Sequence, residues 1–237
     1  MKRVINIALV VLFVAAIVCG WRLYNNYRDD AVANTAVDDL LTMKPGSDDA
    51  DSVPVDFTSL RTANSDIIAW LTIPDTAIDY PVMQAADNQY YLHYDVDKKE
   101  NKNGAPFLDY RAHADFSDFN NVIYGHHMRS GRMFQNLVKF KEKAFFDSHT
   151  AGTLYTPNQT WRLGIFAVAV TPEHSAWYDN TLFSIAKKEA HLQMMQKTAM
   201  YYRDIGVTAD DRIVLLSTCS YEYNGARLVV AARLMKI

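Results

Sequence analysis

Residues 213–220 read Ile-Val-Leu-Leu-Ser-Thr-Cys-Ser, an apolar run that ends in hydroxyl groups and a thiol. The run has the length and residue types of a buried strand, so it predicts that Cys219 leaves the end of that strand, where loops and solvent begin. A second apolar run opens at Arg227, and an Asn-Gly turn signal at 224–225 separates the two. This pattern predicts a hairpin that brings Arg227 back beside Cys219, where a guanidinium favours the thiolate.

The composition is that of a globular protein with a full core. The 237 residues are 49% hydrophobic and 22% charged, which suits one substantial domain or two small ones. Only two cysteines are present, and Cys19 lies in an apolar N-terminal segment, so Cys219 has no partner for an internal disulfide outside that segment. Cys219 is therefore either an inert, buried small side chain or a functional thiol.

The N-terminus predicts a membrane anchor. Lys2 and Arg3 precede an 18-residue uncharged run from Val4 to Trp21. As a helix it would be roughly 27 Å long, close to the hydrocarbon thickness of a bilayer. The basic tip favours a cytoplasmic N-terminus, so residues 1–21 are expected to form the tip and a single transmembrane signal anchor, with the rest extracellular. A cleaved signal peptide is the alternative, but the residues near the end of the run fit a cleavage site poorly.

The charge of the remaining chain argues against a nucleic-acid partner. All 27 acidic residues but only 20 of the 24 basic ones lie after residue 28. A net negative domain lacks the basic footprint that nucleic acid or anionic lipid requires.

Residues 22–56 are expected to be a juxtamembrane helix and linker, followed by a catalytic domain at 57–237. Residues 29–43 have helical spacing, whereas residues 44–52 are polar, acidic and contain Pro and Gly. Sequence does not decide whether this segment packs on the domain.

The domain itself predicts a mainly β fold with few helices. Thr58 or Ser59 is expected to cap a short first helix. Further helical segments are expected at 87–92, 131–146 and 180–202, the last directly before the cysteine strand. Short strands are expected at 67–73, 78–83, 105–109, 121–125, 154–157, 161–170, 213–218 and 227–235. About eight short strands with turn signals between them predict an antiparallel barrel.

A second stretch with chemical character is Asn-Val-Ile-Tyr-Gly-His-His-Met at 121–128. It is another apolar strand that ends in glycine and histidine. A catalytic cysteine needs a proton partner, and imidazole titrates in the right range. The His126–His127 doublet lacks the further ligands of a metal site, so no metal and no cofactor are expected.

Three separated motifs together resemble the sortases, cysteine transpeptidases of Gram-positive bacterial surfaces. They are Tyr124-Gly125-His126, Leu216-Ser217-Thr218-Cys219 and then Arg227, in that order behind a membrane anchor. The short spacing from Cys219 to Arg227, the segment 79–82 before 87–92, and the long helix before the cysteine strand resemble class B. The resemblance covers residues 57–237 and implies a closed eight-stranded sortase β-barrel.

The resemblance also implies an activity. A sortase cleaves a C-terminal sorting signal after Thr, forms a thioacyl-enzyme on the cysteine, and transfers the surface protein to an amino group of peptidoglycan or its lipid-linked precursor. By match to the motifs, Cys219 is the nucleophile, His126 the proton-transfer partner, and Arg227 the oxyanion or substrate-positioning cation. The expected substrate-binding residues are Asn88, Leu92, Ser217 and Tyr223.

Other functions remain open on the sequence. A cell-surface cysteine hydrolase would use the same Cys and His, and a pilin-polymerising sortase would use a different acceptor amine. A membrane-tethered binding module with an incidental thiol would need no catalytic Cys or His, and its Cys219 would not be rapidly alkylated at neutral pH.

Overall fold

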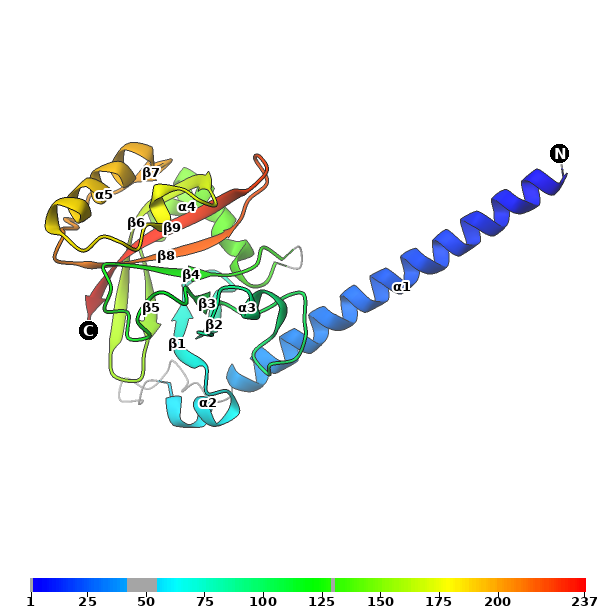
Figure 1. Cartoon of the computed structure of the whole chain (residues 1–237), viewed down its shortest axis with the longest axis horizontal. Coiled ribbons are helices and arrows are strands. Elements are labelled where there is room, and N and C mark those ends of the chain that lie inside the picture. The colour runs from blue at the N-terminus through cyan, green and yellow to red at the C-terminus, as the bar shows by residue number, and fades with distance from the viewer. Residues whose placement is uncertain (1, 42–54, 129–130) are drawn as a thin grey trace.

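Eight strands form a closed ring in this computed structural model, which describes residues 2–41, 55–128 and 131–237 (Figure 1). Their order is β5-β1-β2-β3-β4-β8-β9-β6, the ring closes where β5 pairs with β6, and β7 adds to an edge of β6. The barrel predicted from the spacing of short apolar runs is thus confirmed. The strands are β1 Ile67–Thr72, β2 Asp79–Met83, β3 Phe107–Leu108, β4 Asn120–Tyr124, β5 Ala151–Tyr155, β6 Thr160–Pro172, β7 Tyr201–Tyr202, β8 Arg212–Cys219 and β9 Ala226–Lys236.

The ring is not purely antiparallel, which corrects the sequence expectation. β2 pairs with β3, and β4 pairs with β8, in parallel. A parallel pair requires a long crossover rather than a hairpin, and such a connection leaves no local turn signal in the sequence. The β4–β8 pair is the more important one, because it places the end of the histidine strand beside the end of the cysteine strand.

The alternation of side chains along β8 divides the core into two layers. Val214 and Leu216 belong to a cluster that draws buried side chains from all eight strands of the ring, so this cluster is the barrel interior. Ile213 and Leu215 point the other way, into a second cluster with Trp177 and residues of helix α5, which spans Ile185–Thr198. Successive strand residues face opposite sides of a sheet. Ser217 and Cys219 therefore continue the outer face, beneath the segment that contains Trp177.

The short helices begin and end differently from the sequence expectation. α2 spans Phe57–Ala63, and its N-cap is Asp56, whose carboxylate accepts the backbone N–H groups of Thr58 at 3.0 Å and Ser59 at 3.2 Å. The prediction that Thr58 or Ser59 caps this helix is wrong, because those residues supply the N–H groups that the cap satisfies. α3 spans Tyr90–His93, which overlaps the predicted 87–92 segment, starts later and ends one residue beyond it.

The helix expected over residues 131–146 is two elements. A 3₁₀ helix, η1, covers Phe134–Lys141, and α4 covers Lys143–Ser148. The backbone of Glu142 between them is extended, with φ −86° and ψ 122°. The apolar spacing over this range reflects two short helices that bury Phe140 and Phe146 in the same core.

The helix before the cysteine strand is shorter than the predicted 180–202. A 3₁₀ turn, η2, covers Ala176–Tyr178, and α5 covers only Ile185–Thr198. Ser184 caps α5 by accepting the N–H of Lys187 at 3.3 Å. Beyond Thr198 the chain extends and forms β7 against β6. Strand pairing therefore overrides the helical periodicity at the C-terminal end.

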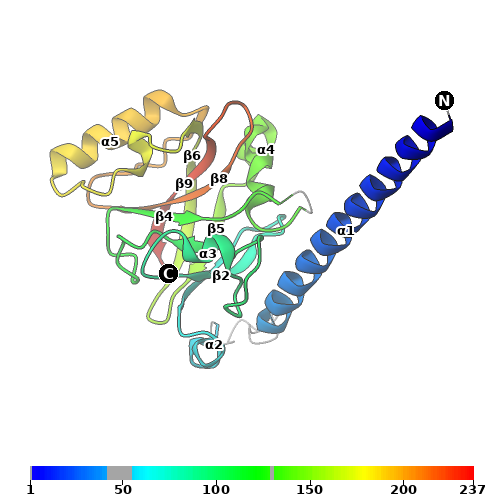
Figure 2. The same ribbon diagram turned by 45° about the vertical axis from the view of Figure 1, so that its right-hand side comes forward.

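α1 is a single helix from Lys2 to Leu41 that projects away from the barrel (Figures 1 and 2). Its segment Arg3–Arg28 is long and apolar enough to cross a membrane. The helix continues past residue 21, where the sequence placed the end of the anchor, and it contacts the barrel domain through Asn26 with Lys102 and Asp38 with Arg132. The linker predicted at 44–52 lies outside the described residues.

Candidate active site

Cys219 is the last residue of β8 and lies directly opposite Arg227, the second residue of β9. The hairpin predicted from the Asn-Gly turn signal is confirmed, and it places the thiol and the guanidinium at the turn end of the β8–β9 pair. Cys219 is half-buried, and no disulfide involves it. A partly exposed thiol beside a cation has the environment of a reactive cysteine.

His126 is placed near Cys219 by the parallel ladder between β4 and β8. Tyr124 pairs with Ser217, and the N–H of Gly125 donates to the carbonyl of Ser217 at 3.0 Å. β4 ends at Tyr124, and two residues beyond this last pair His126 lines the same groove as Cys219. The His126 ring and the Cys219 thiol, both predicted to be catalytic, thus lie at one end of the sheet although they come from distant parts of the chain.

The His126 ring is held by a backbone carbonyl rather than by the thiol. Its Nε2 lies 2.9 Å from the carbonyl oxygen of Leu92. A carbonyl oxygen only accepts hydrogen bonds, so Nε2 carries the proton and Nδ1 of the neutral ring is left as a proton acceptor. Among the described residues, no hydrogen bond joins His126 to the Cys219 sulfur, so catalysis requires the ring to turn or a bound substrate to bridge the gap.

Burial lowers the pKa of His126 below its usual value, and the hydrogen bond to Leu92 opposes this effect. The lowered pKa favours the neutral ring at neutral pH. The close packing depends on Gly104, which has φ +56°, since a side-chain carbon there would lie 2.2 Å from the carbonyl oxygen of Tyr91 and 3.1 Å from the His126 ring. This glycine was not anticipated from the sequence.

His127 has a different role from its neighbour. Its Nδ1 lies 3.0 Å from the backbone carbonyl oxygen of Cys219, and its ring packs edge-on against Tyr221. β4 ends at Tyr124, so neither histidine belongs to the strand. His127 contacts the backbone of β8 at Cys219, whereas His126 lines the groove.

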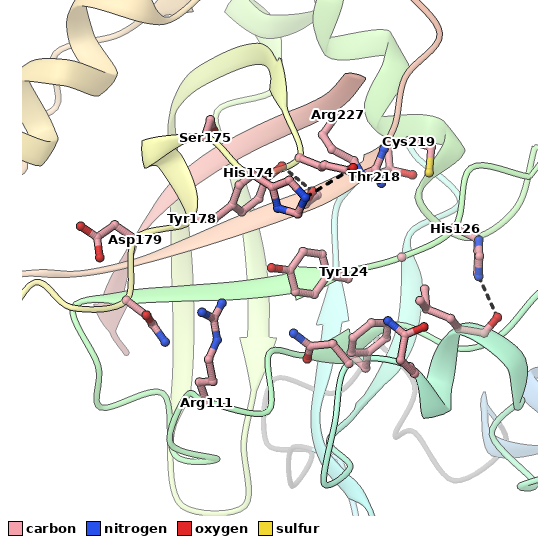
Figure 3. A pocket seen from close by; sticks show the side chains of 18 residues that line it. Arg111, Tyr124, His126, His174, Ser175, Tyr178, Asp179, Thr218, Cys219 and Arg227 are labelled. Atoms are coloured by element: carbon pink, nitrogen blue, oxygen red, sulfur yellow. Dashed lines mark hydrogen bonds and ion pairs between the residues drawn. The ribbon is translucent and has the colours of Figure 1, made fainter. Parts of the chain in front are cut away.

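These groups line a groove with a volume of about 580 Å³ on the outer face of the barrel (Figure 3). Figure 3 shows Cys219 and Arg227 along one wall with His174 and Tyr178, and Tyr124 and Arg111 across from them. The groove is lined by Asn88, Gln89, Leu92, Phe107, Arg111, Tyr124, Gly125, His126, Glu173, His174, Ser175, Tyr178, Asp179, Asn180, Ser217, Thr218, Cys219 and Arg227.

The predicted substrate-binding residues are only partly gathered at this groove. Asn88, Leu92 and Ser217 line it, whereas Tyr223 lies on the β8–β9 turn, exposed and not among the lining residues. The Ser217 hydroxyl is buried and lies 2.9 Å from the hydroxyl of Tyr178. Burial raises the pKa of Tyr178 to about 12, so this phenol remains a neutral hydrogen-bonding group.

Arg111 and Tyr124, which line the groove, belong to a charged hydrogen-bond network that the sequence did not reveal. Arg111 donates two hydrogen bonds to the buried carboxylate of Asp109, at 2.9 and 2.7 Å. Tyr124 donates to the same carboxylate at 3.2 Å. Burial acts to raise the pKa of Asp109, but the bonds and charge of Arg111 outweigh it and hold the pKa below its usual value. The one available signal was the Asp-x-Arg spacing, which is too common to be informative.

Arg227 is held by two acceptors. One of its terminal nitrogens donates to Glu173 at 2.6 Å, and the other donates to the carbonyl of Ala226 at 3.2 Å. Glu173 comes from the segment between β6 and η2, and no sequence pattern marked it. Among the described residues, no group of three or more His, Cys, Asp and Glu side chains could hold a metal ion.

Comparison with known proteins agrees with this arrangement. A family model described as a Sortase domain matches residues 71–235. Sortase B of Listeria monocytogenes is 34% identical over 223 residues, which cover 91% of this chain and 89% of that protein. The crystal structure of sortase B from Bacillus anthracis in complex with AAEK1 superposes with a TM-score of 0.79 at 31% identity, covering 89% of this chain and 100% of that one. A Staphylococcus aureus sortase B–substrate complex superposes with a TM-score of 0.72 at 27% identity, over 76% of this chain and 85% of that one.

Proposed function

The chain belongs to the sortase family and is a cysteine transpeptidase that anchors surface proteins, and on this premise we propose how its residues carry out the reaction. The observation that carries the proposal is the position of Cys219 opposite Arg227, with His126 lining the same groove. A thiol, an imidazole and a guanidinium at one groove are the groups that acyl transfer through a thioester requires.

Cys219 is the nucleophile. Its thiolate attacks the carbonyl carbon of the peptide bond that follows a threonine in the substrate, forming a C–S bond and a tetrahedral oxyanion. When that intermediate collapses, the C–N bond breaks and the acyl group remains on sulfur. An incoming amine then attacks the thioester, and the thiolate leaves.

His126 transfers the protons. The neutral ring first takes the proton of the Cys219 thiol, which leaves the thiolate. The imidazolium gives that proton to the departing amine, and the ring then takes a proton from the incoming amine and returns it to the departing thiolate, so the thiol and the ring are unchanged over a full cycle. In the free protein the ring donates to Leu92, which also lines the groove. We expect substrate bound against Leu92 to disturb that contact and allow the ring to reach the reacting bond.

Arg227 supplies fixed positive charge where the oxyanion develops. Guanidinium is planar and carries five N–H groups, so it can hold protein acceptors and still offer donors to the reacting carbonyl. Its position directly across from Cys219 suits a role at the scissile bond.

The groove binds the sorting signal as an extended segment. Asn88 and Leu92 contribute from the wall that contains α3, and Ser217 from β8. A hydroxyl has one donor and two acceptor sites, so Ser217 can keep its bond to Tyr178 and still contact substrate. Tyr223 acts from the β8–β9 turn, where its exposed ring is available to a bound peptide.

The acceptor is an amino group of peptidoglycan or of its lipid-linked precursor, and the apolar segment of α1 is a single membrane span. The basic tip places the N-terminus in the cytoplasm and the barrel outside. The segment Arg3–Arg28 supports the anchor by its length and composition.

The test uses the full-length chain in a mild detergent with internally quenched peptides that contain candidate sorting signals. We expect cleavage after threonine, and we expect an added amine to appear in the product. Cys219→Ala is the matched control and should give neither product. Cleavage that is unaffected by amine would favour a hydrolase, and no cleavage of any signal peptide, with no rapid alkylation of Cys219, would favour a binding module.

A further inference from the structure

We infer that Glu173 is a positioning residue that holds the guanidinium of Arg227 in its working orientation. This inference rests on the proposed function, because it concerns how the groove prepares Arg227 for the scissile carbonyl. Glu173 accepts a hydrogen bond from Arg227 at 2.6 Å, and both side chains line the groove with Cys219.

The backbone places Glu173 at this position as firmly as its side chain does. β6 and β9 run antiparallel with Thr171 opposite Arg227 and Pro172 opposite Ala226, so Glu173 follows directly on the paired region. Its N–H then donates to the carbonyl of Gly225 at 3.0 Å. The segment after β6 is thus joined to the turn before β9 by backbone pairing, and the carboxylate reaches Arg227 from a fixed base.

The contacts leave Arg227 with donors for a ligand. Glu173 and the carbonyl of Ala226 each take one N–H. A guanidinium has five, so three remain for substrate or oxyanion. Two acceptors, Glu173 in the segment after β6 and the carbonyl of Ala226 on β9, fix the plane of the group. A planar donor fork needs such a fixed plane in order to meet a carbonyl oxygen in a set direction.

Stability alone does not account for the pair. The side chains of Arg227 and Glu173 are 27% and 44% exposed, and ion pairs with that degree of exposure contribute little to folding. A long, flexible arginine beside a nucleophile is useful only if it is held in place, because rotamer freedom would otherwise be lost in each catalytic cycle. Figure 3 shows Arg227 beside Cys219 at the groove, the place where this orientation has an effect.

The kinetic test is a double-mutant cycle in the full-length chain with a quenched signal peptide. Glu173→Ala should lower kcat/KM by about tenfold, mainly through kcat if Arg227 acts on the transition state. Glu173→Gln should lose less, because its amide oxygen still accepts the hydrogen bond without the charge. In an Arg227→Ala background, Glu173→Ala should have no further effect. The exposed Glu189→Gln on α5 is the matched control and should leave activity unchanged.

Three results would overturn the inference: no loss in Glu173→Ala, a gain in activity, or an equal loss with and without Arg227. A gain would mean that Glu173 competes with substrate for Arg227. A separate measurement works even if no tested peptide is cleaved, which would count against the proposed function rather than this inference. The guanidinium NMR signal of Arg227, assigned by its loss in Arg227→Lys, should show hindered rotation in the wild type and faster rotation in Glu173→Ala. Equal rotation in both proteins would also reject the inference.

Discussion

At the scale of single residues, the adjacent histidines His126 and His127 differ in the groups that they contact. His126 lines the groove and donates to Leu92, whereas His127 faces the backbone of Cys219 and the ring of Tyr221. These contacts fit the proposed role of His126 in proton transfer, and they give His127 a contact with the Cys219 backbone.

We therefore expect His126→Ala to lower turnover at least a hundredfold, within the range for loss of a general acid–base group. His127→Ala should cost only severalfold, since it removes one support for the Cys219 carbonyl. Steady-state kinetics on a quenched peptide measures both, with the exposed His113→Ala as control. An inactive His127→Ala beside an active His126→Ala would reverse the assignment.

A related residue-scale prediction concerns Arg227. Arg227→Lys keeps the charge but not the planar fork, so it cannot bond to Glu173, Ala226 and substrate in the same directions. We expect a loss of at least tenfold in kcat/KM with an unchanged unfolding temperature. Full activity in Arg227→Lys would show that only charge is needed at this position.

At the scale of elements, α5 carries a titratable group in an apolar setting. His191 is buried against Phe119, and its Nε2 has no hydrogen-bond partner in the part of the chain that the structure describes. Burial lowers its pKa from 6.5 to about 4, with the charge of Asp179 acting in the opposite direction. The folded state therefore resists protonation of this ring, whereas the unfolded state does not.

This difference predicts acid sensitivity. As pH falls from about 6.5 to about 4, the unfolded chain binds a proton that the folded chain does not, so the free energy of unfolding falls. The loss from this group is at most about 3 kcal/mol. His191→Phe should flatten this part of the pH dependence in urea unfolding, and the exposed His174→Gln should not. An unchanged slope in His191→Phe would exclude His191 as the cause.

The elements also show which local predictions succeed. The strand at Ile213–Cys219 and the turn before Arg227 were predictable, because apolar runs and an Asn-Gly step act locally. The length of α5 was not, because residues 201–202 join β6 and only the folded barrel supplies that partner. The break at Glu142 is similar, since the apolar spacing runs through η1 and α4 and does not reveal the extended backbone between them.

At the scale of the whole molecule, the membrane-type segment and the barrel are nearly independent. Side chains 3–24 of α1 are exposed, and among the described side chains Asn26 bonds to Lys102 and Asp38 pairs with Arg132 of the barrel domain. Removing residues 1–25 should therefore leave a folded domain whose unfolding temperature is within a few degrees of the full-length value and whose peptide cleavage is retained. Calorimetry and kinetics check this, and a truncated chain that precipitates or unfolds under all conditions would show that α1 supports the fold.

The site is also assembled at this scale, which limits its prediction from sequence. Cys219 and Arg227 are neighbours in one hairpin, so their proximity could be inferred from a turn signal. The position of His126 near Cys219 depends on the parallel pairing of β4 with β8. The contact of Glu173 with Arg227 depends on the register of β6 with β9. Both pairings join segments that are distant in the sequence, and the residue pattern of each segment does not indicate its partner strand.

That assembly has a consequence for the timing of folding. Cys219 lies on the penultimate strand of the chain and Arg227 on the last one, while the histidine strand comes from the middle of the chain. Contacts between distant segments form slowly, because large loops must close before they gain any stabilisation. A chain still emerging from the ribosome thus has an ordinary cysteine with no organised partners. Arg227 therefore comes to lie beside Cys219 only when the last strand of the chain, β9, pairs with β8.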